Sequence, residues 1–115
     1  MNERPIILFD RGAIARAVAG RAAEQKWPAD RVLVISGICV WYADHPDASI
    51  GYEGGLPNDD MRRMIEGVAH GTHADARTVL SAFGAAHCLL CDTVPGFRPV
   101  LHSAWDRRAG SADHG

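Results

Sequence analysis

Apolar residues are spaced along the first part of this chain as they are on one face of a helix. Ile14, Val18 and Ala22 recur every four residues within residues 12–25, and charged side chains fall on the other faces. Asp10 stands in front as a candidate N-cap. Trp27-Pro28 is expected to end the segment, because the residue before a proline disfavours helical geometry. The pattern therefore predicts an amphipathic helix over residues 12–25.

Two further apolar segments carry a less distinct pattern. Residues 5–9 (PIILF) are a short continuous apolar run, which predicts a buried strand. Residues 30–43 are rich in β-branched side chains, and this composition slightly favours a strand. One face of a helix that Asp30 could cap would nevertheless hold Val32, Ile35, Ser36, Cys39 and Val40. Local propensity alone leaves both alternatives open, with the strand somewhat ahead.

Residues 44–58 (DHPDASIGYEGGLPN) concentrate turn-forming residues between apolar segments. Such a run indicates that backbone geometry is specified there, and it predicts a loop with a short extended piece at residues 49–52. The residues expected to be structurally important in this loop are Gly51, Tyr52, Gly54, Gly55 and Asn58.

The second half predicts short helices separated by breakers. Asn58 or Asp59 is a good N-cap for a helix over residues 61–68, which Gly71-Thr72 should break. A second short helix is expected over residues 75–83, ended by Gly84. Residues 88–91 (CLLC) read as a short apolar strand or a helix end. Turns are expected at Pro95-Gly96 and Pro99, and one or two helical turns over residues 100–107.

Length and composition bound the class of protein. The 115 residues are 47% apolar and 23% charged, which predicts one globular domain over residues 1–107 with a mobile polar tail over residues 108–115. The net charge of −2 argues against a nucleic-acid-binding or membrane-surface protein. No apolar run has the length of a membrane span or of a secretory signal. Three cysteines do not suggest a disulfide framework, so a cytoplasmic protein is expected.

Several residues could carry chemistry, but none forms a complete motif. Cys88-x-x-Cys91 has the spacing of one half of a zinc site, yet only His102 follows it and no second pair is visible. Inert thiols, with no metal and no cofactor, are therefore expected. His73-Ala-Asp75 lacks the glutamate of the nucleobase deaminases. Neither a nucleophile elbow nor a phosphate-binding loop occurs.

Residues 69–83 can also be threaded on a helix-turn-helix, with Arg77 and Thr78 facing DNA. His73 then occupies a turn position where glycine is usual, and the surrounding charge is mixed. Two short packed helices are the favoured interpretation, and a small DNA-binding regulator is kept as the alternative of a different class.

The order of these segments resembles the α-chain portion of the threonine N-terminal-nucleophile hydrolases that include glycosylasparaginase and the plant-type asparaginases. Residues 5–8 are similar to the family's first strand. Residues 27–44 are similar to a family segment that is helical, so the resemblance predicts a helix where propensity favours a strand. Residues 44–58 are similar to its SVGYGGLPN-type segment, with Glu53 inserted. Met64-Ile65-Glu66-Gly67 resembles IMDG, and residues 87–90 resemble HVLL.

The resemblance implies a fold, a partner and an activity. The fold would be α+β, half of an αββα sandwich completed by a second chain, the β chain of the same precursor. The implied activity is cleavage of the side-chain amide of asparagine or N4-glycosyl-asparagine, with an L-asparaginase or isoaspartyl peptidase subunit as the alternative. The nucleophile would be a threonine outside this chain, freed by self-cleavage at a junction flanked by His114 and Gly115.

The same resemblance bears on binding. Residues 9–12 replace a tryptophan-containing loop of the family, and Arg11 is a guess for a contact to an anionic substrate. The implied partners are the β chain, in an αβ heterodimer or its dimer, and a small asparagine-type substrate. Neither a nucleic acid nor a membrane is expected as a partner.

Overall fold

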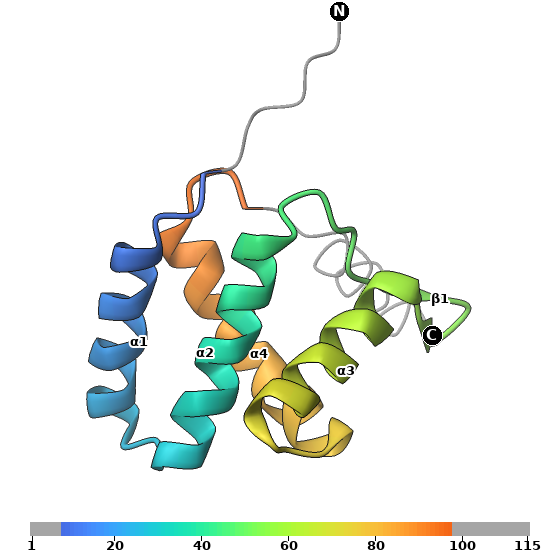
Figure 1. The fold of residues 1–115 in the computed structure, drawn as a ribbon. Helices are drawn as coiled ribbons and strands as arrows, with labels where there is room; N and C mark the ends of the chain where they lie inside the picture. Colours follow the sequence, from blue (N-terminus) through green and yellow to red (C-terminus); the bar gives the residue numbers. More distant parts are fainter. Residues whose placement is uncertain (1–7, 98–115) are drawn as a thin grey trace, which may run out of the picture.

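In the computed structural model, residues 8–97 are described, and they form four helices and one short hairpin (Figure 1). The helices are α1 (Arg11–Gln25), α2 (Ala29–Asp44), α3 (Asp59–Thr72) and α4 (Ala76–Thr93). The strands β1 (Tyr52–Glu53) and β2 (Leu56–Pro57) pair antiparallel. None of the helices in this part of the chain is both long and apolar enough to cross a membrane.

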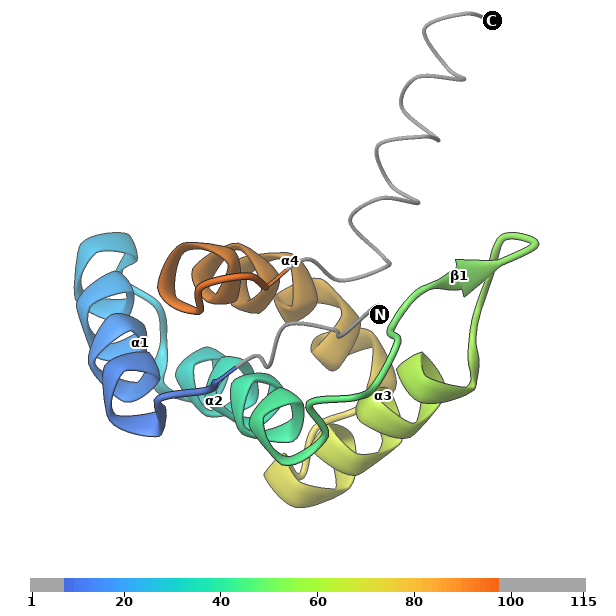
Figure 2. The ribbon, with the colours of Figure 1, turned by 90° about the horizontal axis from the view of Figure 1, so that it is seen from above.

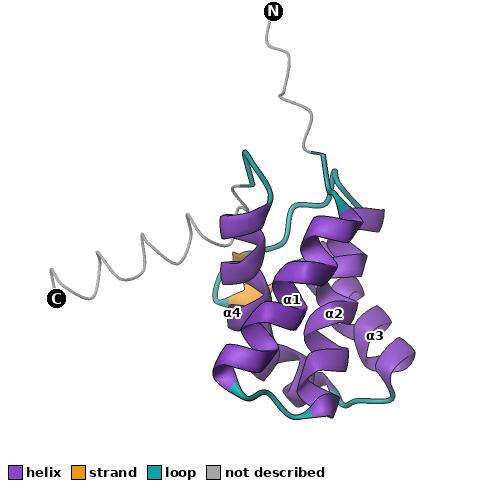
Figure 3. Ribbon diagram, turned by 90° about the vertical axis from the view of Figure 1, so that its left-hand side faces the viewer, coloured by secondary structure: helices purple, strands orange, loops and turns teal. Residues whose placement is uncertain are grey.

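Helices α2 and α4 form the centre of the molecule. Each packs against the other and against both α1 and α3, and α1 and α3 flank this pair on opposite sides (Figures 1 and 2). The four helices therefore enclose one core, to which Ile50 from the connector and Phe97 after α4 also contribute. Figure 3, seen from the α1 side, shows the helices running alongside one another with loops at both ends.

Short polar side chains set the beginnings of three helices. The carboxylate of Asp10 accepts a hydrogen bond from the Ala13 N–H at 3.0 Å and begins α1. Asn58 and Asp75 do the same for α3 and α4. A side-chain oxygen at this position satisfies a backbone donor that the helix itself cannot pair. The predicted cap at Asp10 is thus confirmed, and of the two caps considered for α3 it is Asn58 that serves. Of the predicted apolar stripe on α1, Ile14 and Val18 are buried and Ala22 is half-buried.

Residues 30–43 are helical. The strand that local propensity slightly favoured is wrong, and the helix predicted from the resemblance is present as α2. Val34, Ile35 and Ile38 are at most 3% exposed, because α1, α3 and α4 all pack around this helix. Burial on several sides by other helices outweighs the modest helix penalty of β-branched side chains.

Helix α4 does not stop at Gly84. The sequence predicted a short helix over residues 75–83, whereas α4 continues to Thr93 and includes the CLLC segment. The exposed Gly84 lies on the outer face, while Phe83 and Ala86 on either side are buried in the core. An isolated glycine costs a helix about 1 kcal/mol, which burial of several apolar side chains exceeds.

Other predictions fall partly or wholly outside the described residues. Of the predicted strand at residues 5–9, only Leu8 and Phe9 are described, and neither is in a strand. The predicted turn at Pro99, the helical turns at residues 100–107, the tail at 108–115 and the junction at His114 and Gly115 lie outside residues 8–97. The sandwich half completed by a second chain remains a prediction.

Candidate functional site

The connector between α2 and α3 is built from backbone constraints. Gly54 and Gly55 form the two-residue turn of the hairpin with φ values of +62° and +84°, which match the type of turn that joins twisted antiparallel strands. The Asn58 N–H donates to the Gly51 carbonyl oxygen at 2.8 Å, which closes the base of the hairpin. Glycine suits both turn positions because an L side chain is strained at positive φ.

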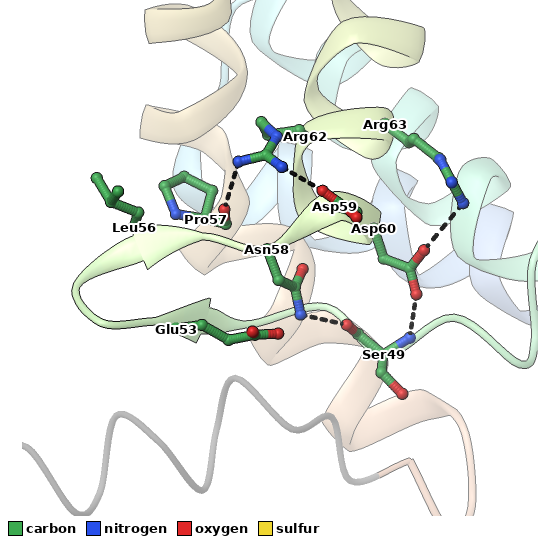
Figure 4. A pocket seen from close by; sticks show the side chains of 9 residues that line it. All are labelled: Ser49, Glu53, Leu56, Pro57, Asn58, Asp59, Asp60, Arg62 and Arg63. Carbon is green, nitrogen blue, oxygen red and sulfur yellow. Dashed lines mark hydrogen bonds and ion pairs between the residues drawn. The ribbon is translucent and has the colours of Figure 1, made fainter.

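The side chains of Asn58, which caps α3, and of Asp60 within α3 hold Ser49 of the connector (Figure 4). Asn58 donates from Nδ2 to the Ser49 carbonyl oxygen at 2.7 Å, while its Oδ1 accepts from the Met61 N–H at 2.9 Å. The Ser49 N–H in turn donates to the Asp60 carboxylate at 2.9 Å. These bonds fix the connector to the start of α3. The neighbouring side chain of Ile50 is fully buried in the core.

An open pocket of about 500 Å³ lies between the hairpin and the first turn of α3. Its charged groups largely neutralise one another: Arg62 pairs with Asp59 and also donates to the Pro57 carbonyl oxygen, and Arg63 pairs with Asp60. Glu53 is exposed and makes no ion pair within residues 8–97. With its arginines paired to neighbouring carboxylates, the pocket has no cluster of uncompensated charge.

Arg11, the guessed substrate contact, is engaged elsewhere. Its guanidinium pairs with the Asp44 carboxylate at 2.5 Å, and both side chains are about half exposed. The pair joins the start of α1 to the end of α2, where the connector begins. Helix α1 and the hairpin lie at opposite sides of the molecule in Figures 1 and 2, so Arg11 is not brought to the hairpin pocket.

A second, apolar groove of about 410 Å³ runs between α2 and α3. Leu33 and Val40 on its rim are 54% and 48% exposed. Its floor includes Gly37, where a Cβ atom would come within 3.0 Å of Thr72 and 3.2 Å of Val68. A side chain at position 37 would therefore press against α3.

Trp41 lines this groove, and His45 follows the last residue of α2 at the start of the connector. Their rings stack with centroids 4.0 Å apart, and the His45 Nδ1 lies 2.9 Å from the Trp41 carbonyl oxygen.

The histidines and cysteines of the second half do not assemble into a metal site in the described residues. No group of three or more metal-ligating side chains is present there, and His102 lies outside this range. His70 and His73 are exposed at the end of α3. His87 and Cys91 do come together on α4, with Nδ1 and Sγ 3.9 Å apart.

The His87–Cys91 pair was missed from the sequence. An i, i+4 spacing identifies neighbours only on a helix, and the CLLC segment was read as a strand or a helix end.

Burial separates the three cysteines, which are not joined by disulfides. Cys39 is 1% exposed, and burial raises the pKa of its thiol to about 12. Burial, and then the thiols of Cys91 and Cys39, also raise the pKa of Tyr42. Cys91 is half-buried and Cys88 is exposed. Cys39 is thus a core residue, whereas Cys88 is accessible to solutes.

Comparison of the chain with protein-family models, with curated proteins and with solved structures finds no match. The assignment of function therefore rests on the sequence pattern and on the geometry described above.

Proposed function

We propose that this chain is the α chain of a threonine-type N-terminal-nucleophile amidohydrolase that cleaves the side-chain amide of asparagine or N4-glycosyl-asparagine. The observation that carries the proposal is the order of α2 and the connector. The resemblance predicts a helix within residues 27–44, followed by a glycine-rich segment over residues 44–58, although local propensity favoured a strand. Helix α2 ends at Asp44, and the hairpin with Gly54 and Gly55 follows it.

In this proposal the chain supports the chemistry without supplying the nucleophile. A free N-terminal threonine uses its own α-amine as the base for its hydroxyl, which attacks the amide carbon and forms a β-aspartyl ester that water then hydrolyses. Hydrogen-bond donors fixed around the carbonyl oxygen stabilise the tetrahedral intermediate. The connector, held by Asn58 and Asp60, would act as a rigid wall next to that site.

Expression of the gene from which this chain comes tests the proposal. Intact mass spectrometry should detect a second chain that begins with threonine and copurifies with this one. The complex should release aspartate from one of three substrates: N4-(β-N-acetylglucosaminyl)-asparagine, L-asparagine or a β-aspartyl dipeptide. Replacing the terminal threonine by alanine in the precursor should abolish both self-cleavage and aspartate release. The proposal fails if no such second chain exists.

A second candidate, a helix-turn-helix DNA-binding protein, is favoured by the geometry at His73. Helices α3 and α4 are joined by three residues, and His73 adopts φ +56°, the left-handed conformation that a turn glycine would have. Arg77 and Thr78 are exposed in the first turn of α4, where a recognition helix contacts bases.

Duplex binding at several salt concentrations distinguishes this candidate from the hydrolase. Arg77→Ala should weaken binding and reduce the salt slope by about one unit if Arg77 contacts a phosphate. Arg16→Ala is the matched control, because Arg16 is also exposed but lies on α1. Equal binding by the two variants would exclude α4 as a recognition helix.

A further inference from the structure

The last turns of α4 bring two cysteines together in different environments. Cys88 is exposed and Cys91 is half-buried, three residues further along the same helix. Side chains three residues apart are neighbours on a helix surface. The pair thus combines a thiol that a solute can reach with a second, less exposed thiol that neighbours it on the helix surface.

Arg21 of α1 places a positive charge beside Cys88. Its guanidinium pairs with Asp92, and that hydrogen bond, followed by a weaker one with Cys88, raises the pKa of Arg21. The thiolate is the form of a cysteine that reacts with peroxides and alkylating agents.

His87 provides a base for the second thiol. Its Nδ1 lies 3.9 Å from the Cys91 Sγ, one turn back on the same face of α4. The imidazole can accept the thiol proton as Cys91 attacks another sulfur. The two cysteines therefore have distinct neighbours, an arginine for Cys88 and a histidine for Cys91.

We propose that Cys88 and Cys91 form a peroxide-sensitive thiol pair that closes to a disulfide. The Cys88 thiolate attacks a peroxide, the O–O bond breaks, and Cys88 becomes a sulfenic acid. The leaving hydroxide or alkoxide takes up the proton that the thiol had released and becomes water or an alcohol. The Cys91 sulfur then attacks the Cys88 sulfur, the S–O bond breaks, and the oxygen leaves as water, which carries the proton that Cys91 lost. One peroxide is reduced by two electrons for each disulfide formed, and a dithiol reverses the reaction.

The helix makes this disulfide readily reducible. Cβ atoms three residues apart on a helix are about 5–6 Å apart, whereas a disulfide requires about 3.5–4.5 Å. Closure therefore distorts the end of α4, where the Val94 N–H donates to the Leu90 carbonyl oxygen at 2.8 Å. Phe97 follows the end of α4, and its ring packs edge-on against two others. The ring centroids are 5.1 Å apart for Phe97 and Tyr42, and 5.9 Å apart for Phe97 and His87. Oxidation should loosen this aromatic contact.

Treatment of the full chain with hydrogen peroxide, followed by intact mass spectrometry and peptide mapping, tests the proposal. The expected product has lost two hydrogens and contains a Cys88–Cys91 link, with Cys39 unmodified. In Cys91→Ser, dimedone should trap a sulfenic acid on Cys88. In Cys88→Ser, Cys91 should stay reduced over the same time. Oxidation of Cys88 to sulfonic acid without a disulfide, or links only between molecules, would overturn the proposal.

The role of Arg21 has its own control. Arg21→Gln should slow alkylation of Cys88 by about twofold to fivefold, the range expected for loss of one exposed charge interaction. Arg16→Gln, an exposed arginine of the same helix, should leave the rate unchanged. Equal rates for the two variants would remove Arg21 from the proposal. Circular dichroism confirms that each variant is folded, and neither outcome depends on hydrolase activity.

Discussion

The Asn58 side chain, at the end of the connector, holds its middle by donating to the Ser49 carbonyl oxygen at 2.7 Å. The same side chain caps α3 through the Met61 N–H. One amide thus fixes both the position of the loop and the first residue of the helix. Because the two bonds use different atoms of Asn58, they can be separated by substitution.

Asn58→Ala should lower the free energy of unfolding by about 1–2 kcal/mol, because the helix loses its cap and the Ser49 carbonyl its donor. Asn58→Asp keeps an oxygen for the Met61 N–H and loses only the donor to Ser49, so its loss should be smaller. Urea denaturation followed by circular dichroism measures both. Equal losses for the two variants would show that the cap contributes little.

The hairpin turn should tolerate no ordinary side chain at its two glycines. Gly54→Ala and Gly55→Ala place a Cβ at φ +62° and +84°, and each should cost about 1–2 kcal/mol of stability. Open space surrounds both positions, so the penalty comes from the backbone alone. Gly20→Ala on α1 also meets nothing within 4 Å and should stabilise by about 0.5–1 kcal/mol. Thermal denaturation compares the three, and a stabilising Gly55→Ala would contradict the turn assignment.

Gly84→Ala distinguishes a continuous α4 from two shorter elements. Gly84 lies inside the helix and a Cβ there would meet nothing within 4 Å, so alanine should raise the stability by about 0.5–1 kcal/mol. A glycine that ended a helix would have positive φ, and alanine would then destabilise the protein. The sign of the change in urea midpoint therefore decides between the two arrangements.

Gly84 also illustrates what local sequence can and cannot predict. Asp10 and Asn58 were recognised as caps because a cap needs only its own few residues. The continuation of α4 depends on Phe83 and Ala86 packing against other helices, which a local pattern does not contain. The same holds for α2. Its β-branched residues favour a strand locally, and the helix is stabilised because α1, α3 and α4 pack around it.

The residues of the candidate sites also differ in how far the sequence alone could predict their roles. The structural role of Gly54 and Gly55 follows from residue type, because few other residues adopt their φ values. The Arg11–Asp44 pair and the contact of Arg21 with Cys88 join residues far apart in the sequence. No spacing rule in the sequence reveals such pairs. The pairing of Arg11 with Asp44 could therefore not be predicted when Arg11 was considered as a substrate contact.

Stability should fall at acidic pH partly through Asp75, the N-cap of α4. The pKa of Asp75 is lowered because the Thr78 N–H, and then the Thr78 hydroxyl, donate to its carboxylate. A carboxylate with a lower pKa in the folded state stabilises that state above its unfolded pKa of about 3.9. This contribution is lost as the pH falls from there through the folded value.

Urea midpoints measured from pH 7 to pH 2 test the assignment to Asp75. Asp75→Asn keeps an oxygen for the Thr78 N–H but cannot titrate, so the loss of stability below about pH 4 should become shallower. Asp75→Ala should show the same shallower profile and also lower stability at every pH, because α4 then has no cap. A profile for Asp75→Asn as steep as that of the unchanged protein would mean that other carboxylates cause the acid sensitivity.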